Sequence, residues 1–522
     1  MTTWFLRRRV LPTLIPLLLV ALMAGCATNP VTGKKELTLI SEDREIALGA
    51  QNYTPAQQSQ GGPYTASPEL VRYVRSVGNR LAKVSDRPNL PYEFTVLNNS
   101  VPNAWAMPGG KIAINRGLLV ELSSEAELAA VLAHEIVHSA ARHGAKSIER
   151  AMALQTGVMA TSYAAQGHRD GVWAVAGANV AGQMTQLKYS RGAERESDLY
   201  GTRYMVRAGY NPKSAIALQE TFLRLKNGKR SGLFEKLFSS HPPSEERIRN
   251  NKEAVADLPQ GGFVGKQEYV KAMTTLQHAA GAYQAYDKGS AALRKGNAGE
   301  ALTLARRASR IEPHEALFYG LQGDALAADK QMRPAIKAYN KAIRHNDNYF
   351  LFFLRRGQVR QKLGDRAGAR SDLERSNALF PTAESNDALG RIALAQNRRI
   401  DAVNHFRFAA QAKSETGRAA YKHLAQLTMS DSPTDFLRTT AGIARDGRLV
   451  VSLHNAGPID VSHVVIGLRQ QYGNIVKTSQ FSYKNRLPAG AKVQLPTELR
   501  PDLQDRTLNQ VIGVQVLTAR PL

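Results

Sequence analysis

The sequence His134-Glu135-Ile136-Val137-His138 lies near the middle of a predicted helix. Ser124-x-x-Glu127 forms a capping box that opens this helix, which we expect to run to about His143. Apolar residues flank the histidines, so the helix is expected to be buried around a polar centre. Burying two imidazoles and a carboxylate is costly unless they share a counter-ion.

Two histidines four residues apart share one face of a helix, so His134 and His138 can bind one metal ion. Glu135 lies beside that ion and can take a proton from a water molecule. We expect zinc, because two histidines, a carboxylate and an open position suit it, although manganese or cobalt can substitute in vitro. The alternative is an exposed helix that carries two histidines and no metal.

A third ligand is offered by the later stretch from Ser190 to Asp198. Glu194 and Asp198 lie four residues apart on one face of the next predicted helix. We expect Glu194 to bind the metal and Asp198 to hydrogen-bond a ligating histidine and fix its tautomer. Glu196 lies on a different face and is the weaker candidate. The alternative is an acidic first turn that only suits the helix dipole.

The sequence around these motifs predicts a mostly helical α+β domain over residues 27–265. Strands are predicted at 92–96, 104–107 and 111–115, the last two around the turn Pro108-Gly109-Gly110. Helices are predicted at 69–84, at 194–208, after Asn211 with Pro212 as the first helical residue, and over much of the Ala- and Gly-rich stretch 151–183.

Residues 280–430 are built from repeats. Gly289, Gly323 and Gly357 are spaced by 34 residues, and Gly390 follows 33 residues later. Four alanines repeat the same steps: Ala301, Ala335, Ala369 and Ala402. Helix–turn–helix units of this length are typical of tetratricopeptide repeats, and about four of them would stack into an all-α solenoid. Its concave face is expected to bind a peptide or protein partner; the alternative is a scaffold without a ligand.

Residues 433–522 change to alternating apolar and polar positions, as in 449–453, 464–468 and 511–516, with turn residues between them. This pattern predicts a small β-rich domain resembling a β-sandwich. We find no catalytic motif in it.

Residues 1–26 resemble the signal peptide of a bacterial lipoprotein. A basic segment precedes an apolar run from Val10 to Met23, and Ala24-Gly25 precedes Cys26, the only cysteine. The run is short for a transmembrane helix. The resemblance implies that the Cys26 thiol carries a lipid anchor, and Ala27 in the next position favours the outer membrane, facing the periplasm. The alternative is an uncleaved anchor with a free thiol.

The charge of the chain is strongly positive, with 69 Lys and Arg against 44 Asp and Glu and a formal net charge of +25. Such a balance favours anionic lipid or acidic protein surfaces as partners, or it only reflects solvated basic faces. No nucleic-acid-binding motif is present, so no nucleic-acid partner is expected.

The chain resembles the M48 family of metallopeptidases, whose members pair HExxH with Glu-x-Glu/Gln-x-Asp on a later helix. The resemblance is strongest to envelope members with C-terminal tetratricopeptide repeats. It also rests on the segments Asn29–Gly33, Leu37–Gly49, Asn103–Gly110 with Ile112 and Gly117-Leu118, Arg142-His143, and His241-Pro242 followed by Arg247. The β-rich C-terminal region is a departure, because the repeats commonly end the chain in this group.

The resemblance implies a gluzincin-type protease domain. One zinc ion would be bound by His134, His138 and Glu194, and Glu135 would act as base and then as acid. It also implies that His241 can take the fourth metal position and hold the enzyme silent until a substrate displaces it. The alternative for His241 is a loop histidine before a proline.

Further roles are expected for residues around these ligands. Arg247 would pair with a carboxylate or help to stabilise an oxyanion, and His143 is expected to be structural because it leaves the metal-facing side of the helix. The strand at 111–115 is expected to bind an extended substrate by β-augmentation. The residues predicted for this substrate strand are Asn103, Gly109, Gly110 and Ile112.

Together these features predict a zinc-dependent endopeptidase, lipid-anchored in the periplasm of a Gram-negative bacterium. It would degrade or process misfolded or stalled outer-membrane and periplasmic proteins, and its repeats would recruit substrates or assembly partners. The alternative is a repeat-based chaperone or adaptor with latent or minor protease activity. A third hypothesis is a basic protein that binds anionic lipid or lipopolysaccharide, with salt-sensitive membrane association.

Overall fold

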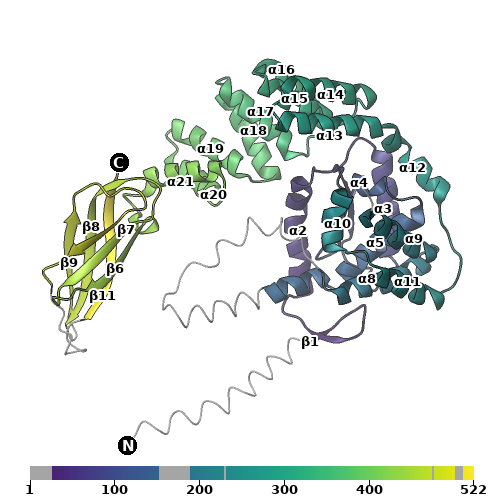
Figure 1. The fold of residues 1–522 in the computed structure, drawn as a ribbon, viewed down its shortest axis with the longest axis horizontal. Helices are drawn as coiled ribbons and strands as arrows, with labels where there is room; N and C mark the ends of the chain where they lie inside the picture. Colours follow the sequence, from purple (N-terminus) through teal and green to yellow (C-terminus); the bar gives the residue numbers. More distant parts are fainter. Residues whose placement is uncertain (1–25, 152–188, 228–230, 473–474, 500–509) are drawn as a thin grey trace, which may run out of the picture. The chain divides into compact units, whose positions relative to one another are not determined.

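The computed structural model describes residues 26–151, 189–227, 231–472, 475–499 and 510–522 (Figure 1). The predicted signal peptide up to Gly25 and most of the predicted helical stretch 151–183 lie outside these residues. The chain divides into two compact units, one ending at Phe352 and one running from Phe353 to Leu522, and this boundary falls inside the predicted repeats. Among the described residues, no helix combines the length and the apolar character needed to cross a bilayer.

The first unit contains a three-stranded sheet in the order β3-β5-β4. β3 (Glu93–Leu97) runs parallel to β5 (Lys111–Asn115), and β4 (Ala104–Met107) runs antiparallel to it. The turn between β4 and β5 contains Gly109 and Gly110, both with positive φ, 74° and 83°. A Cβ on Gly109 would lie 2.7 Å from the Cα atom of Ile46, so the turn has no room for a larger residue.

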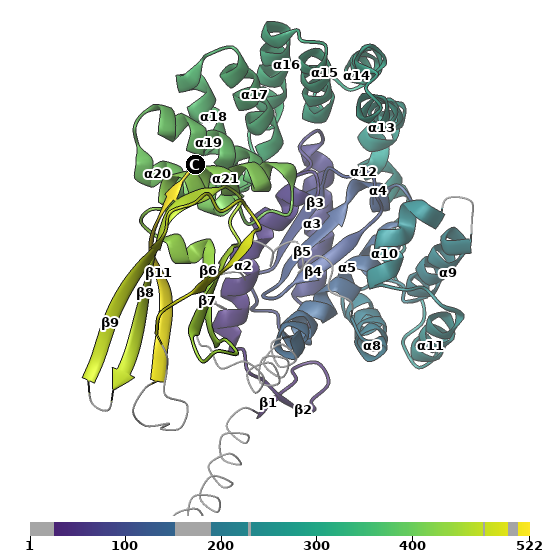
Figure 2. The same cartoon turned by 60° about the vertical axis from the view of Figure 1, so that its left-hand side comes forward.

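Helices cover both faces of this sheet (Figure 2). On one face, α2 (Glu42–Ser59) packs against the strands through a core that includes Tyr53, Trp105 and Met107. On the other face, α3 (Pro68–Ala82) and α5 (Glu125–Ala140) share the main core with alternate strand residues such as Ile112. The sheet is therefore buried on both faces, and α5 packs against one of them.

The sheet order overturns the prediction that the strand at 111–115 binds a substrate by β-augmentation. β5 is the central strand, so β3 and β4 occupy both of its edges. Ile112 pairs with Phe94 and Ala106 and is fully buried. The backbone of β5 therefore has no free hydrogen-bonding edge for a further strand.

The helix α5, which carries His134 and His138, also ends earlier than predicted, at Ala140 rather than near His143. Arg142 adopts a positive φ of 61°, which stops the helix, and residues 143–151 are helical again. Ser124 caps the helix by accepting a hydrogen bond from the backbone N–H of Glu127. The capping box is not reciprocal, because the Glu127 carboxylate accepts from the backbone N–H of Ser123 instead.

The remaining helices of this domain surround α5. α8 (Arg191–Arg207) and α9 (Lys213–Asn227) pack directly against α5, and α11 (Glu245–Ala256) packs against α8 and α9. The short helices α4 (Arg116–Leu119) and α10 (Glu235–Ser240) and the hairpin of β1 (Cys26–Thr28) and β2 (Lys35–Leu37) complete it, with the 3₁₀ turn η1 (Ser231–Phe234) before α10.

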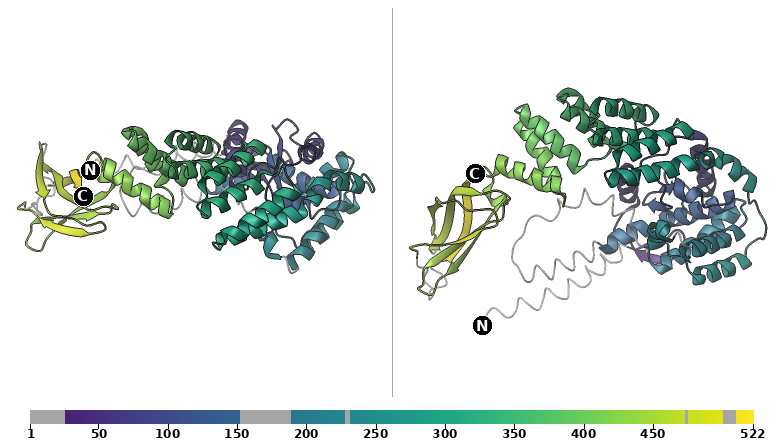
Figure 3. Two further views of the ribbon diagram at one scale, coloured as in Figure 1. Left: turned by 90° about the horizontal axis from the view of Figure 1, so that it is seen from above. Right: turned by 45° about the horizontal axis from the view of Figure 1, so that its top comes forward.

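The repeat region is a series of helices (Figure 3): α12 (Lys266–His278), α13 (Ala280–Arg294), α14 (Ala298–Ile311), α15 (Ala316–Ala328), α16 (Met332–His345), α17 (Phe350–Lys362), α18 (Arg366–Leu379), α19 (Ala383–Ala395), α20 (Arg399–Ala409) and α21 (Glu415–Thr428). The small residues of the 34-residue pattern lie where helices cross. A Cβ on Gly323 would lie 2.5 Å from the Tyr339 ring, and one on Gly390 would lie 2.7 Å from the Phe406 ring. The four repeated alanines are all fully buried.

Within the first unit, the first repeats are joined to the sheet by a buried polar network. The Glu315 carboxylate accepts hydrogen bonds from Asn98 at 2.9 and 3.0 Å and from the Tyr283 hydroxyl at 2.5 Å. Arg116 donates to Asn98 at 2.8 Å, and its guanidinium lies 3.4 Å from the centre of the Tyr283 ring. The network holds α13 and α15 against the ends of β3 and β5.

The second unit ends in six strands among its described residues: β6 (Leu437–Ile443), β7 (Leu449–Asn455), β8 (Val461–Tyr472), β9 (Ile475–Tyr483), β10 (Lys492–Pro496) and β11 (Gln510–Pro521), after the 3₁₀ turn η2 (Pro433–Asp435). They form two antiparallel sheets, β10-β7-β6 and β11-β8-β9. Residues from both sheets, including Val451 and Ile466, share one core with Phe406 and Leu424 of the last repeat helices.

Candidate metal centre

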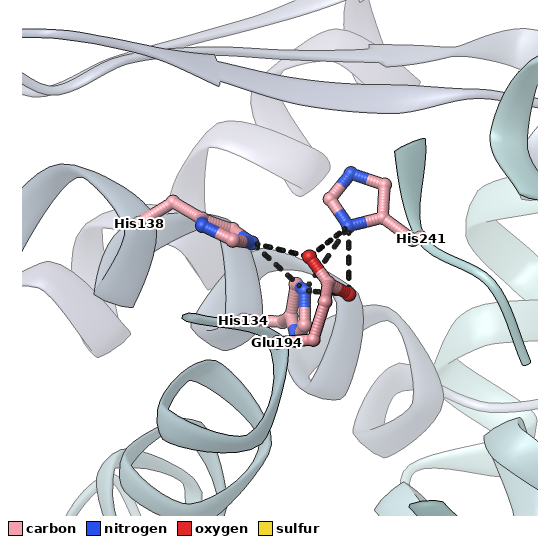
Figure 4. Close-up of side chains that lie close together, drawn as sticks. All are labelled: His134, His138, Glu194 and His241. Atoms are coloured by element: carbon pink, nitrogen blue, oxygen red, sulfur yellow. Dashed lines mark hydrogen bonds and ion pairs between the residues drawn. The ribbon is translucent and has the colours of Figure 1, made fainter. Parts of the chain in front are cut away.

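Three helices bring four of the predicted site residues together (Figure 4). α5 presents His134 and His138, α8 presents Glu194, and His241 directly follows α10. Their ligand atoms all lie within 4.8 Å of one another. The side chain of His134 is 12% exposed and the other three are nearly fully buried, so the cluster is shielded from bulk water.

Short distances join five of the six ligand pairs, and the ligand atoms of the sixth pair, His138 and His241, lie within 4.8 Å of each other. The Nε2 atoms of His134 and His138 lie 3.0 Å apart, and the Glu194 carboxylate lies 3.5 Å from the first and 3.3 Å from the second. The Nδ1 atom of His241 lies 3.3 Å from His134 Nε2 and 3.2 Å from both Glu194 oxygens. The side chains thus point their lone-pair atoms at one shared centre.

This spacing fits a tetrahedral zinc site. Zinc bonds to nitrogen and oxygen ligands of about 2.0–2.1 Å place the ligand atoms about 3.3 Å apart. The six distances given above, which cover five of the six ligand pairs, run from 3.0 to 3.5 Å. Two histidines, a glutamate and a further histidine are also ligand types that zinc prefers. His134, His138, Glu194 and His241 therefore suit a zinc ion in both geometry and chemistry.

Asp198 and Arg247 form a hydrogen-bonded pair behind the ring of His134. The Nδ1 atom of His134 lies 3.0 Å from Oδ1 of Asp198. Arg247 donates to both oxygens of Asp198 at 2.7 Å and lies 3.2 Å from Oε2 of Glu194. A carboxylate on Nδ1 fixes the tautomer that leaves Nε2 free for a metal. Arg247 thus pairs with the carboxylates of Asp198 and Glu194 in the structure.

Glu135 lies beside the cluster with one oxygen free of protein partners. Its Oε1 atom lies 3.5 Å from Nε2 of His241, whereas its buried Oε2 atom has no hydrogen-bond partner. Burial raises the pKa of the Glu135 carboxyl above its usual value. A buried carboxylate of this kind is suited to accepting a proton from a bound reactant.

The cluster shifts the pKa values of its members in opposite directions. Burial lowers the pKa of His134, but the carboxylates of Glu194 and Asp198 outweigh it and raise this pKa to about 10. Burial holds the pKa of His138 well below its usual value. Burial raises the pKa of Glu194, but the charges of His241 and His134 outweigh it and leave it well below the usual range. The arrangement therefore keeps Glu194 ionised.

A comparison with known proteins agrees with this geometry: residues 68–255 match the model of Peptidase family M48. This segment is an M48 peptidase domain. The matched segment contains α5, α8 and His241, and so the whole cluster.

The chain is similar to the β-barrel assembly-enhancing protease of Yersinia pestis, with 26% identity over 249 residues, 46% of this chain and 50% of that protein. It is also similar to the mitochondrial metalloendopeptidase OMA1 of Schizosaccharomyces pombe, with 29% identity over 233 residues, 43% of this chain and 65% of that protein. The chain spans about half the length of the β-barrel assembly-enhancing proteases that it matches.

A solved structure of MamA from Desulfovibrio magneticus RS-1 is similar to part of the chain. The two chains align with a TM-score of 0.26 and 22% identity, and the alignment covers 28% of this chain and 84% of the MamA chain.

A cavity of the M48 domain opens beside Glu135 and His134. Its walls are largely apolar and include Leu118, Val131 and Phe222, and two buried amides, Gln219 and Asn251, also line it. Such a cavity next to the reactive carboxylate is suited to holding an apolar side chain of a bound peptide.

Three residues beside the cluster were missed or given a lesser role by the sequence analysis. Tyr189 stacks on His138 with ring centres 3.8 Å apart and donates a hydrogen bond to the backbone oxygen of Ala106. His143 lies 2.9 Å from His138, and Glu196 lies 3.2 Å from His143. Nothing in the sequence indicated Tyr189, but the Arg142-His143 pair and the alternating acids of α8 were visible signals for the other two.

The helices α5 and α8 approach each other closely at Gly201. A Cβ at this position would lie 3.2 Å from the backbone nitrogen of His134 and 3.3 Å from the carbonyl carbon of Ala133. Both neighbours are backbone atoms, which cannot rotate away. The absence of a side chain at Gly201 therefore sets the distance between Glu194 and the two histidines.

We predict that Gly201→Ala disturbs the site whereas Gly192→Ala does not. A Cβ on Gly192, in the exposed first turn of α8, would meet only the Ser190 hydroxyl at 3.7 Å. The helix propensity of alanine should make Gly192→Ala neutral or up to about 1 kcal/mol stabilising. Gly201→Ala should destabilise by about 1–3 kcal/mol and weaken zinc binding, because the helices must separate. Urea unfolding and zinc titration of both variants check this; equal behaviour of the two would contradict it.

Proposed function

We propose that this chain is a zinc-dependent endopeptidase of the bacterial cell envelope. The observation that carries the proposal is the closed set of ligand atoms on His134, His138, Glu194 and His241 beside the partnerless oxygen of Glu135. The M48 peptidase domain and the metalloendopeptidase among its relatives support the same reaction class.

The residues divide the work of peptide hydrolysis between them. His134, His138 and Glu194 would hold the ion, and Asp198 and Arg247 fix His134 and Glu194 in place. A bound zinc ion supplies Lewis-acid activation of a water molecule and of the substrate carbonyl. Glu135 would accept one proton of the water as its oxygen bonds to the peptide carbonyl carbon. It would then deliver that proton to the amide nitrogen as the C–N bond breaks, giving a carboxylic acid and an amine.

His241 acts as a switch in this proposal. Its Nδ1 atom lies at hydrogen-bonding distance from Glu194 and His134, in the fourth corner of the cluster. A catalytic zinc site needs an open fourth position. His241 therefore closes the site at rest, and a substrate that enters the cavity beside Glu135 displaces it.

The proposal also includes a place of action and a substrate class, which the relatives and the N-terminal sequence support. We propose outer-membrane or periplasmic proteins, misfolded or stalled in assembly, as substrates, because several relatives are named β-barrel assembly-enhancing proteases. Cys26 follows a sequence that resembles a lipoprotein signal, so the proposal includes a lipid anchor in the outer membrane. The repeats would recruit substrates or assembly partners, since stacked helix pairs present an extended binding surface.

A second candidate function is a repeat-based chaperone or adaptor with latent protease activity. The observation that favours it is the closure of the cluster, because His241 fills the fourth corner and Tyr189 stacks on His138. In this case the repeats carry the function, and loss of Glu135 leaves it intact.

We predict that Glu135→Gln abolishes peptide hydrolysis while zinc stays bound. The amide keeps the shape of the side chain but cannot accept the proton, so the rate should fall by roughly 10²–10⁴-fold. The measurement is cleavage of an unfolded protein such as casein, together with zinc content. Glu220→Gln is the matched control, because Glu220 is exposed on α9 and pairs with Lys252. Full activity of Glu135→Gln, in vitro or in cells, would favour the adaptor.

We predict that His241→Ala accelerates cleavage of the same substrate. Removing the imidazole opens the fourth corner of the cluster, while His134, His138 and Glu194 keep the metal. Initial rates at equal zinc loading measure the effect, with the exposed His278→Ala as control. Loss of zinc and activity together in His241→Ala would instead make His241 a required ligand.

A further inference from the structure

The two ligating histidines differ in what holds their second ring nitrogen. Nδ1 of His134 lies against the carboxylate of Asp198 at 3.0 Å. Nδ1 of His138 lies against Nδ1 of another histidine, His143, at 2.9 Å. The outer nitrogen of His143, Nε2, lies 3.2 Å from Oε2 of Glu196. A chain of three side chains therefore runs from the cluster to the edge of the domain.

The metal-binding role of His138 decides which atom donates each hydrogen bond in this series of side chains. If Nε2 of His138 offers its lone pair to the ion, the single ring proton of the neutral imidazole must sit on Nδ1. Nδ1 of His143 must then accept a hydrogen bond from that N–H, so the ring proton of His143 sits on Nε2. That N–H points at the Glu196 carboxylate, which can only accept. Each ring N–H in this series of side chains therefore faces one hydrogen-bond acceptor.

A bend in the backbone at Arg142 places His143 beside His138. Arg142 adopts a positive φ of 61°, which is unfavourable for a residue with a side chain, and its guanidinium donates to the buried Glu45 carboxylate at 2.9 Å. The bend folds His143 back under His138, although five residues along a straight helix would point it away. Behind it, a Cβ on Gly144 would lie 3.2 Å from the Pro108 ring, so the bend is closely packed.

α8 supplies the carboxylates that contact His134 and His143. Glu194 belongs to the cluster, Asp198 holds His134, and Glu196 points to the other side of the helix, where it reaches His143. His143 is buried and the Glu196 side chain is 30% exposed, so only the outer end of the chain contacts water.

We propose that His143 and Glu196 are positioning residues that fix the tautomer and ring orientation of His138 for zinc binding. The inference rests on the proposed metal site but assigns a role that the site itself does not require. His143 replaces the direct carboxylate that usually holds a ligating histidine.

A matched pair of variants tests the proposal. His143→Asn places Oδ1 close to the position of Nδ1 and can still accept a hydrogen bond from the Nδ1–H group of His138, whereas His143→Leu has nearly the same shape and cannot. Zinc affinity of the full-length protein is measured by competition with a chromophoric chelator. His143→Leu should bind zinc about 10–100-fold more weakly than wild type, and His143→Asn should regain most of that loss. Glu196→Leu should weaken binding by a smaller factor, because water can replace its exposed carboxylate, and Glu196→Gln should restore it.

A second readout separates positioning from general stability. The visible absorption bands of the cobalt-substituted protein report the ligand geometry and should change in His143→Leu but not in His143→Asn. Thermal unfolding of both variants without metal should be the same. Equal zinc affinity of the Asn and Leu variants, whether as tight as wild type or equally weakened, would overturn the proposal. Failure of the wild-type protein to bind zinc would instead reject the metal site on which it rests.

Discussion

The close packing of α5 against α8 is the constraint on which the rest of the site depends. His134 and His138 come from one helix and Glu194 from the other, and Gly201 lets the two backbones approach. The buried sheet under α5 and the helices around it hold this pair at a fixed distance. Because protein interiors transmit small displacements, a change of a few tenths of an ångström there moves three ligands at once.

The electrostatics of the site follow from the same packing. α8 brings three carboxylates, Glu194, Glu196 and Asp198, against two histidines of α5 and against His143 and Arg247. Every buried carboxylate of this set faces an imidazole or a guanidinium, which limits the desolvation cost of its charge. Glu135 of α5 differs from these carboxylates, because its buried Oε2 atom has no hydrogen-bond partner, and this atom lies where the proposed reaction needs a base.

The sequence predicted those features that depend on local spacing. The four-residue steps from His134 to His138 and from Glu194 to Asp198 place each pair on one helical face, and the 34-residue period predicts the helix pairs. The order of strands in the sheet depends on long-range pairing, so β5 was wrongly taken as a substrate edge. The role of His143 depends on the positive φ of Arg142, and the stacking of Tyr189 on His138 has no local signal. The position of His241 came only from family resemblance.

The central claim is that the cluster of His134, His138, Glu194 and His241 binds one metal ion. The most direct test is elemental analysis of the purified protein beside its Glu194→Ala variant. The account predicts about one zinc per chain in the wild type and a large loss in the variant, because a buried carboxylate ligand is removed. Absence of zinc from the wild type, with none taken up on addition, would contradict the account and would leave the repeats as the functional part of the chain.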